Sequence, residues 1–411
     1  MEHVTPNHRK VATSTRFTYD MLDRLTERTE QDLSARWVYD VDAVVAPGSC
    51  SQLKSCGKLI EAYTLAGSSR DARRRYAYDS LGRPSSITSI VGGQKFVTAR
   101  DYDAWGRDSA ERHRLGDGTE REFNRRYNNM GQLDRVEGHG RVLWRATTQT
   151  ASGELATATL GNGMQVAREY NPMTGRLSAA TLINSVGVEQ LREGYGYDAV
   201  GNVSQRTQYW PGTGFIEDFS YDSMNRLERA TVTGKVTETF TYDSVGNITS
   251  KTGVGDYKYP TPGSPRPHAV TSIAGLGSYS YDANGNLLKA PGRTVSWVWS
   301  SFDMPLKTTL GTVTNEFRYG AERERTVQLR NDGTTIYYAG GMELEVSSSV
   351  QRLKTYWPMG LGVTIEQGAD VQLNWIHADR LGSVVAITGT DGMLREKFSY
   401  DRLCCTNKLR A

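Results

Sequence analysis

The sequence lacks the long apolar runs found in membrane proteins and in secreted precursors. Its 411 residues contain no stretch of about 18 apolar residues, which excludes a membrane-spanning helix. The N-terminus, MEHVTPNHRKVATSTR, is polar and has no apolar signal-peptide core. We therefore expect no membrane span and no signal peptide in this chain.

An excess of charge of one sign is also missing. The 49 basic and 46 acidic residues leave a net charge of +3, which is too small to favour nucleic acid or an anionic membrane as a partner. The longest basic runs are Arg73–Arg75 and Arg125–Arg126. We interpret them as solvent-facing strand positions, and a phosphate-binding patch is the alternative.

Cysteine is scarce, and its spacing fits no metal site. The cysteines are Cys50, Cys56, Cys404 and Cys405, with no C-x-x-C pair and no Cys/His cluster. So few cysteines in a long chain do not make a disulfide framework, so we interpret them as incidental thiols. Closure of a small loop by Cys50 and Cys56 is the alternative. We expect no metal and no cofactor.

Proline is rare, with 12 residues, whereas glycine is frequent, with 42. This balance suits tight β-turns rather than disordered linkers. No segment keeps a helical apolar period beyond about two turns. The mean hydropathy of −0.54 and the alternation of apolar and polar residues indicate sheets with one polar face.

A repeated motif dominates the chain. Its clearest copy is Phe240–Thr249: an aromatic residue, a small polar one, Tyr, Asp, two further residues, Gly, Asn or Arg, and an apolar residue. Other copies centre on Tyr19, Tyr78, Tyr102, Tyr127, Tyr170, Tyr197, Tyr221, Tyr281 and Tyr400. A motif that recurs in this way along a chain is typical of an array of small structural units.

The chemistry of the motif predicts a strand, a tight turn and a second strand. Two aromatic residues two positions apart lie on one face of a strand. Asp followed three residues later by Gly is typical of a type I turn with a left-handed residue. Asn225 and Asp23 replace Gly there, and both types tolerate positive φ. Dipeptides such as Asp117-Gly118 and Asn162-Gly163 predict turns at the opposite strand ends.

We assign no catalytic, cofactor-binding or metal-binding residue, and we expect no enzyme. Aspartates at one repeated turn position have a structural role. His377 and Asp379 could form an acid/base pair, but Ser383 lacks a nucleophile elbow. The remaining histidines lie in polar contexts; they are His3, His8, His113, His139 and His268. Gly161-Asn162-Gly163 is a hairpin turn rather than a dinucleotide loop.

We expect four segments along the chain. Residues 1–15 are a disordered polar lead, and residues 16–330 are the hairpin array. Residues 331–400 form terminal strands of a different style, and residues 401–411 are an off-pattern tail.

These motifs resemble the RHS/YD-repeat family of bacterial proteins and the teneurin-like YD-shell. The repeats carry the resemblance over about residues 16–400. The segment His377–Ser383, continuing through Asp391-Gly392 to Tyr400-Asp401, is similar to the closing part of the RHS core. The resemblance implies an all-β fold of tandem β-hairpins that form a spiralling antiparallel sheet, here a partial or open shell.

The resemblance also implies a function. In bacterial members the shell encloses a toxic C-terminal domain, so we expect a non-catalytic shell segment whose partner is a toxin cargo or another toxin-complex subunit. A module that binds carbohydrate or a cell surface is the alternative. A self-cleaving protease or a nuclease toxin would need residues that this chain lacks.

The resemblance further implies that this is a truncated member. The chain stops at Ala411 without the segment that carries an aspartyl self-cleavage site in bacterial members. We expect secretion or a cell-surface location through a dedicated secretion system, and a cytoplasmic location for a non-exported fragment.

Overall fold

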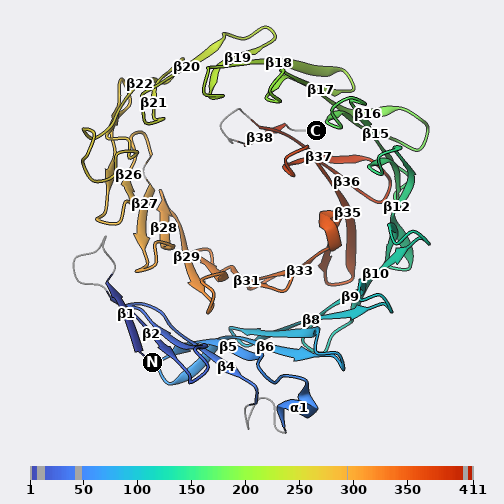
Figure 1. The fold of residues 1–411 in the computed structure, drawn as a ribbon, viewed down its shortest axis with the longest axis vertical. Helices are drawn as coiled ribbons and strands as arrows, with labels where there is room; N and C mark the ends of the chain where they lie inside the picture. Colours follow the sequence, from blue (N-terminus) through green and yellow to red (C-terminus); the bar gives the residue numbers. More distant parts are fainter. Residues whose placement is uncertain (1, 7–13, 42–48, 294, 401–405, 410–411) are drawn as a thin grey trace. The chain divides into compact units, whose positions relative to one another are not determined.

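A computed structural model describes residues 2–6, 14–41, 49–293, 295–400 and 406–409. The described chain is built almost entirely of β-strands, with the short helix α1 (Cys50–Leu53) and the 3₁₀ turn η1 (Pro358–Gly360) (Figure 1). The all-β prediction is confirmed. None of the described helical segments is long and apolar enough to cross a membrane.

The chain divides into two compact units. Unit 1 comprises residues 1–124, 279–357 and 364–371, and unit 2 comprises residues 125–278, 358–363 and 372–411. Both units are built from antiparallel strands that pair with their neighbours in the sequence. The predicted division at residue 330 stays a prediction.

Unit 1 holds two runs of hairpins. In the first run, from β1 to β9, each strand pairs antiparallel with the next. The second run extends from β27 to β33, and β25 pairs with β26. The strands are β1 (Glu2–Pro6), β2 (Ser14–Tyr19), β3 (Leu25–Thr29), β4 (Ser34–Tyr39), β5 (Leu59–Ala66), β6 (Ser69–Tyr78), β7 (Pro84–Val91), β8 (Gln94–Tyr102), β9 (Asp108–Leu115), β25 (Ser280–Tyr281), β26 (Leu287–Lys289), β27 (Val295–Trp299), β28 (Pro305–Leu310), β29 (Val313–Tyr319), β30 (Arg325–Arg330), β31 (Thr335–Ala339), β32 (Met342–Val346) and β33 (Gln351–Tyr356).

Unit 2 holds the consecutive ladder from β11 to β24 and a terminal group, β35 to β38. Strands β10 (Arg121–Tyr127), β34 (Gly362–Gln367) and β35 (Asp370–Ala378) each have residues in both units. The other strands are β11 (Leu133–Gly138), β12 (Arg141–Gln149), β13 (Leu155–Leu160), β14 (Gln165–Tyr170), β15 (Leu177–Ile183), β16 (Glu189–Tyr197), β17 (Val203–Trp210), β18 (Thr213–Tyr221), β19 (Leu227–Val232), β20 (Glu238–Tyr242), β21 (Ile248–Lys251), β22 (Gly255–Lys258), β23 (Ser272–Ile273), β24 (Gly277–Ser278), β36 (Val384–Thr388), β37 (Leu394–Tyr400) and β38 (Thr406–Leu409).

The repeated motif folds as predicted. Strand β6 ends at Tyr78, and the turn after it is closed by hydrogen bonds from Gly82 N to Asp79 O and from Asp79 N to Arg83 O, both 2.9 Å long. Asp79 Oδ1 accepts the backbone N–H groups of Leu81 and Arg83 at 2.9 and 2.8 Å. The aspartate therefore satisfies turn donors that the strands leave unpaired.

In the described copies of the motif, the residue at the glycine position adopts the left-handed conformation. Gly82 has a φ of 76° and Gly246 of 91°, and the replacements Asn225 and Asp23 have φ values of 60° and 57°. The prediction that these two residues stand in for glycine is confirmed.

Replacing Gly246 with valine is expected to cost about 1–3 kcal/mol of stability, because a β-branched residue at positive φ is strained. A Cβ atom at this position would meet open space, so the cost comes from the backbone alone. Thermal melting measures the loss. Gly246→Asn is the control and should lose less, because asparagine tolerates this φ; equal losses would contradict the turn assignment.

Consecutive repeats are joined by a tyrosine hydroxyl. Tyr242 donates a hydrogen bond of 2.8 Å to the carbonyl of Leu227, the first residue after the preceding repeat's turn. The guanidinium of Arg226 lies 4.6 Å from the centroid of the same ring and bonds Asp222 at 2.7 Å. The same hydroxyl–carbonyl bond recurs for Tyr78, Tyr102, Tyr170, Tyr197, Tyr221, Tyr319 and Tyr400.

Removing this hydroxyl in Tyr242→Phe is expected to cost about 1 kcal/mol, because the Leu227 carbonyl loses its donor. Chemical denaturation measures the change. Tyr209→Phe is the matched control, since Tyr209 is exposed on β17, and it should leave stability unchanged. An unchanged Tyr242→Phe protein would mean that this bond does not join the repeats.

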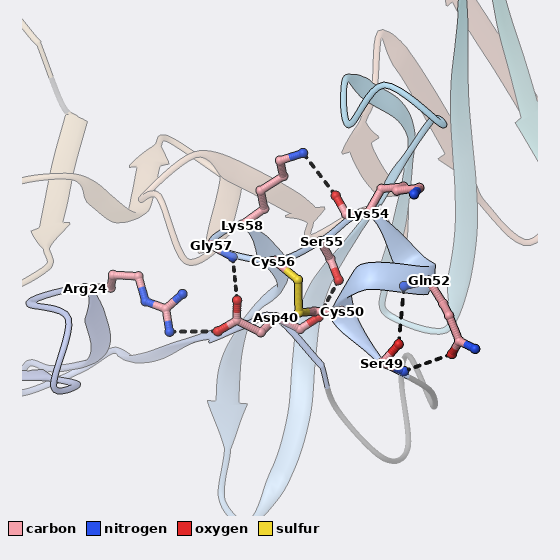
Figure 2. The surroundings of a disulfide bond; sticks show 10 residues. All are labelled: Arg24, Asp40, Ser49, Cys50, Gln52, Lys54, Ser55, Cys56, Gly57 and Lys58. Atoms are coloured by element: carbon pink, nitrogen blue, oxygen red, sulfur yellow. Dashed lines mark hydrogen bonds and ion pairs between the residues drawn. A yellow bond between two sulfur atoms is a disulfide. The ribbon is translucent and has the colours of Figure 1, made fainter.

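The chain termini and the cysteine pair can be compared with their predictions. Within residues 1–15, strand β1 pairs with β2, while residues 1 and 7–13 lie outside the described residues, as do 401–405 and 410–411 of the predicted tail. Cys50 and Cys56 form a disulfide beside α1 (Figure 2). The interpretation of this pair as incidental thiols is therefore wrong, and the small-loop alternative holds. Cys404 and Cys405 lie outside the described residues.

The helix beside the disulfide explains why the two cysteines meet. Ser49 caps α1, accepting a hydrogen bond from Gln52 N, and Lys54 ends the helix in the left-handed conformation. This single turn reverses the chain, so that six residues of separation bring the two sulfur atoms together.

Candidate functional site

A group of buried polar side chains lies in unit 2, where the terminal strands β35–β37 meet the hairpin ladder. In Figure 1 the terminal strands are coloured orange to red, and the ladder runs from blue-green through green to yellow. The Trp375 side chain is fully buried and donates from Nε1 to the carbonyl of Leu143 at 2.9 Å. Asn162 Nδ2 donates to Thr388 Oγ1 at 3.0 Å and to Gly389 O at 2.9 Å. The terminal strands are therefore fixed to β12 and to the β13–β14 turn.

A cavity of about 110 Å³ remains between these elements. Its lining is mainly apolar, with contributions from Trp144, Leu182 and Val385. Three ionisable side chains, Arg168, Glu193 and His377, also line it. This combination of an apolar pocket and a few convergent polar groups is the usual form of a small binding site.

Burial strongly perturbs Glu193. It is only 2% exposed, and Gln208 Nε2 donates to its Oε1 at 3.3 Å. Burial, reinforced by the charge of Asp379 and opposed by Arg206, raises the pKa of Glu193 to about 7. Near neutral pH this carboxyl is divided between its neutral and ionised forms.

The surrounding charges come from both the ladder and the terminal strands. Arg206 donates to Glu217 Oε2 at 2.7 Å and to the carbonyl of Tyr400 at 2.9 Å. The guanidinium of Arg380 lies 5.6 Å from the ring of Tyr195, and Lys397 Nζ lies 5.1 Å from the ring of Trp210. These cation–π contacts add to the attachment of the terminal strands.

The hypothetical acid/base pair is not assembled for catalysis. His377 is buried, its Nε2 lies 2.9 Å from Thr388 Oγ1, and burial lowers the pKa of His377 to about 4. Asp379 instead caps its own turn, accepting from the N–H groups of Leu381 and Ser383 at 2.8 and 2.9 Å. A neutral histidine and an aspartate committed to backbone donors are structural groups.

His113 and His268, two of the other histidines, also have structural partners. His113 Nδ1 lies 3.0 Å from the carbonyl of Gly340, and His268 Nδ1 lies 2.7 Å from Asn247 Oδ1. His139 takes positive φ in a turn. The side chains of His3 and His8 lie outside the described residues. Among the described residues, no group of three or more His, Cys, Asp or Glu side chains could hold a metal ion.

The basic run Arg73–Arg75 in unit 1 is not placed as predicted. Arg73 and Arg75 bond Glu61 at 2.9 and 3.0 Å, Arg70 also bonds it, and Glu61 is completely buried. Arg74 pairs with Glu324 at 2.7 Å. The interpretation of this run as solvent-facing positions is wrong, because the arginines neutralise a buried carboxylate. In the second run, Arg126 pairs with Glu137 at 3.2 Å.

Sequence reasoning missed Glu61, Glu193 and Gln208. Each stands at an alternating position of an ordinary strand, where a charged or amide residue normally faces water. The one available signal for Glu61 was the unusual density of arginine in the next strand. Glu193 had no such signal, because His377, which lines the same cavity, and Asp379, whose charge acts on it, stand far along the chain.

The fold and these contacts define the class of protein: an all-β ladder of hairpins whose polar side chains hold the ladder together. Solved structures share that fold. Neither a family profile nor a curated protein matches the chain.

The matching structures are of Tc toxin chains. The crystal structure of TcdB2-TccC3 without its hypervariable C-terminal region is 15% identical and matches 96% of this chain with a TM-score of 0.71. The crystal structure of TcdB2-TccC3 matches 96% at 16% identity and a TM-score of 0.69. The Photorhabdus luminescens Tc holotoxin pore matches 96% at 14% identity and a TM-score of 0.66.

The fold of this chain is therefore that of a segment of the RHS-repeat shell in those toxins. The chain spans about a quarter of the length of the chains that it matches, since it covers 24% of each. The tandem-hairpin fold expected from the resemblance to RHS/YD-repeat proteins is confirmed.

Proposed function

We propose that this chain is a segment of a hairpin-repeat wall that encloses a cargo polypeptide and contributes no chemistry of its own. The observation that carries the proposal is the fold match over 96% of the chain to TcdB2-TccC3. The cargo would be a toxin polypeptide delivered to another cell, and the chain would act outside the cell that makes it.

The use of the polar side chains supports this proposal. Asp222 is committed to its own turn and to Arg226, and Tyr242 to the preceding repeat. His377 is buried and bonded to a threonine hydroxyl. Groups that could otherwise perform acid/base or nucleophilic chemistry are occupied in holding strands together.

Protection of a fused polypeptide from protease tests the proposal. An unfolded, protease-sensitive polypeptide is joined to the C-terminus of the full chain, and its cleavage is followed by gel electrophoresis. An enclosed polypeptide should be cleaved at least about tenfold more slowly, because cleavage then requires opening of the wall. The control is the same polypeptide mixed with the chain but not joined to it. Equal cleavage rates in the two samples would contradict the enclosure.

A further inference from the structure

A cleft of about 480 Å³ lies in unit 1, beside the disulfide described above. One side is formed by residues of α1 and of the turn that follows it, and the other by residues of β5, β6 and β7. Its volume lies within the range of about 300–1,000 Å³ that is typical of sites for small molecules. The chemistry of its lining therefore indicates what it can bind.

The cleft exists because small side chains meet on one face of β6 and β7. Arg75 pairs with Thr88, and Ala77 pairs with Ser86, in the antiparallel register of the two strands. These four side chains therefore share one face of the sheet. Alanine, serine and threonine fill little of the space next to α1. Arg75 is the only long side chain of the four.

The segment on the opposite side of the cleft is held in place by its own contacts (Figure 2). The disulfide between Cys50 and Cys56 closes the loop that contains α1. Ser55 Oγ donates a hydrogen bond to the carbonyl of Asp40, and Gly57 N donates to Asp40 Oδ1 at 2.5 Å. A site that is ordered before its ligand arrives loses less entropy on binding.

The cleft carries an excess of positive charge. The carboxylate of Glu61 is completely buried and bonds the guanidinium groups of Arg70, Arg73 and Arg75. Three positive charges on one negative charge leave the group positive. Arg75 donates to Glu61 only through Nε, at 3.0 Å, and its side chain is 33% exposed. Its two Nη groups can therefore form paired hydrogen bonds with a second carboxylate.

The rest of the lining is apolar or carries hydroxyl groups. Leu53, Ile60 and Ala77 line the cleft with apolar surface. Ser86 and Thr88 add hydroxyl groups, which can donate to or accept from a polar substituent. A cavity of about 150 Å³ is enough to hold benzene, so this cleft has room for a compound with two fused rings.

We propose that this cleft binds an aromatic carboxylate, with the carboxylate on the guanidinium of Arg75 and the ring against Leu53 and Ala77. The positive charge disfavours amines, and the apolar surface is left uncovered by a small inorganic anion, so the ligand needs both an anionic group and a ring. This binding activity goes beyond enclosure of a cargo and does not rest on it. The titration below and the protease experiment can therefore fail independently.

Isothermal titration calorimetry of the full chain with naphthoate tests the proposal. We expect saturable binding with a dissociation constant on the order of 0.1 mM. Naphthylmethanol keeps the two rings but lacks the charge, and acetate keeps the carboxylate but lacks the rings. Each should bind at least about tenfold more weakly than naphthoate. Equal binding of naphthoate and either of these compounds would overturn the proposal.

Two variants place the ligand in this cleft. Arg75→Gln removes the cation while two arginines still neutralise Glu61, and it should weaken naphthoate binding by at least about tenfold. Ser86→Trp fills the cleft without changing Arg75 and should reduce binding below detection. Circular dichroism checks that both variants fold. If Arg75→Gln does not fold, the Ser86→Trp protein decides the question by itself.

The matched control is an arginine that lines the other cavity. Arg168 contributes to the cavity of unit 2, and Arg168→Gln should bind naphthoate as tightly as the wild-type protein. A wild-type protein without saturable binding, a folded Ser86→Trp protein that still binds, or a loss of binding in Arg168→Gln would each overturn the proposal.

Discussion

Replacing Trp375 with alanine is expected to lower the free energy of unfolding by about 3–5 kcal/mol, the range for a large aromatic residue removed from a core. The side chain is completely buried, and its indole N–H loses the bond to the Leu143 carbonyl. Both the packing and the hydrogen bond attach the terminal strands to the ladder. Chemical denaturation followed by circular dichroism measures the loss.

The matched control is the same substitution at an exposed tryptophan. Trp105 is 80% exposed, and its ring contacts Arg107 at 4.8 Å. Trp105→Ala should therefore cost less than about 1 kcal/mol, the size of an exposed cation–π contact. Equal losses from the two substitutions would mean that the terminal strands do not pack on the ladder through Trp375.

Replacing Glu193 with glutamine is expected to remove a contribution that lowers stability as pH rises from about 4.5 to 7. The pKa of Glu193 is raised to about 7 in the folded protein, above its value near 4.3 in an unfolded chain. The folded state therefore binds the proton more tightly, and stability falls as pH rises through this window. The effect is on the order of 3 kcal/mol.

The turn aspartates act in the opposite direction at lower pH. The backbone N–H of Arg226, against a smaller effect of burial, holds the pKa of Asp222 below its usual value. Such groups stabilise the fold above about pH 4 and lose that contribution as pH falls through their folded pKa. Their window lies below that of Glu193. Burial of His377 lowers its pKa to about 4, so this histidine makes stability rise with pH up to about 6.5 and opposes Glu193 in the same window. The contribution of Glu193 is therefore measured as a difference between the wild-type protein and a variant.

Denaturation at pH 5 and pH 8 provides the test. Relative to the wild-type protein, Glu193→Gln should shift the stability difference between pH 5 and pH 8 by roughly 3 kcal/mol in favour of pH 8. The opposing contribution of His377 should stay the same in both proteins. Glu189→Gln is the control, because Glu189 is an exposed residue on the same strand, β16, and it should keep the wild-type difference. The same pH difference in the Glu193→Gln protein would show that this carboxyl does not titrate in the window.

Local features of the fold could be predicted from the sequence, because local chemistry determines them. Asp79 and Gly82 identify their turn without reference to any other part of the chain. Asn225, at the glycine position of another copy, identifies its own turn in the same way. Thirteen of the strands in the described residues end at a tyrosine, in agreement with the motif. The link from Tyr242 to Leu227 was not predicted, although it also repeats, because it spans fifteen residues and its acceptor is a backbone carbonyl.

The candidate site could not be predicted, because it depends on distant contacts. Trp375 and Leu143 are separated by 232 residues, and no sequence period joins them. Glu61 illustrates the same limit at short range. An alternating strand pattern predicts a solvated carboxylate, whereas three arginines on the next strand allow it to be buried.

Electron microscopy of the full chain joined at its C-terminus to a compact cargo domain tests the wall function most directly. We predict cargo density bounded by the hairpin sheet, with the strands of β11–β24 running continuously along it. Cargo density that stands outside the sheet as a separate body, free of contact with the hairpins, would contradict the account.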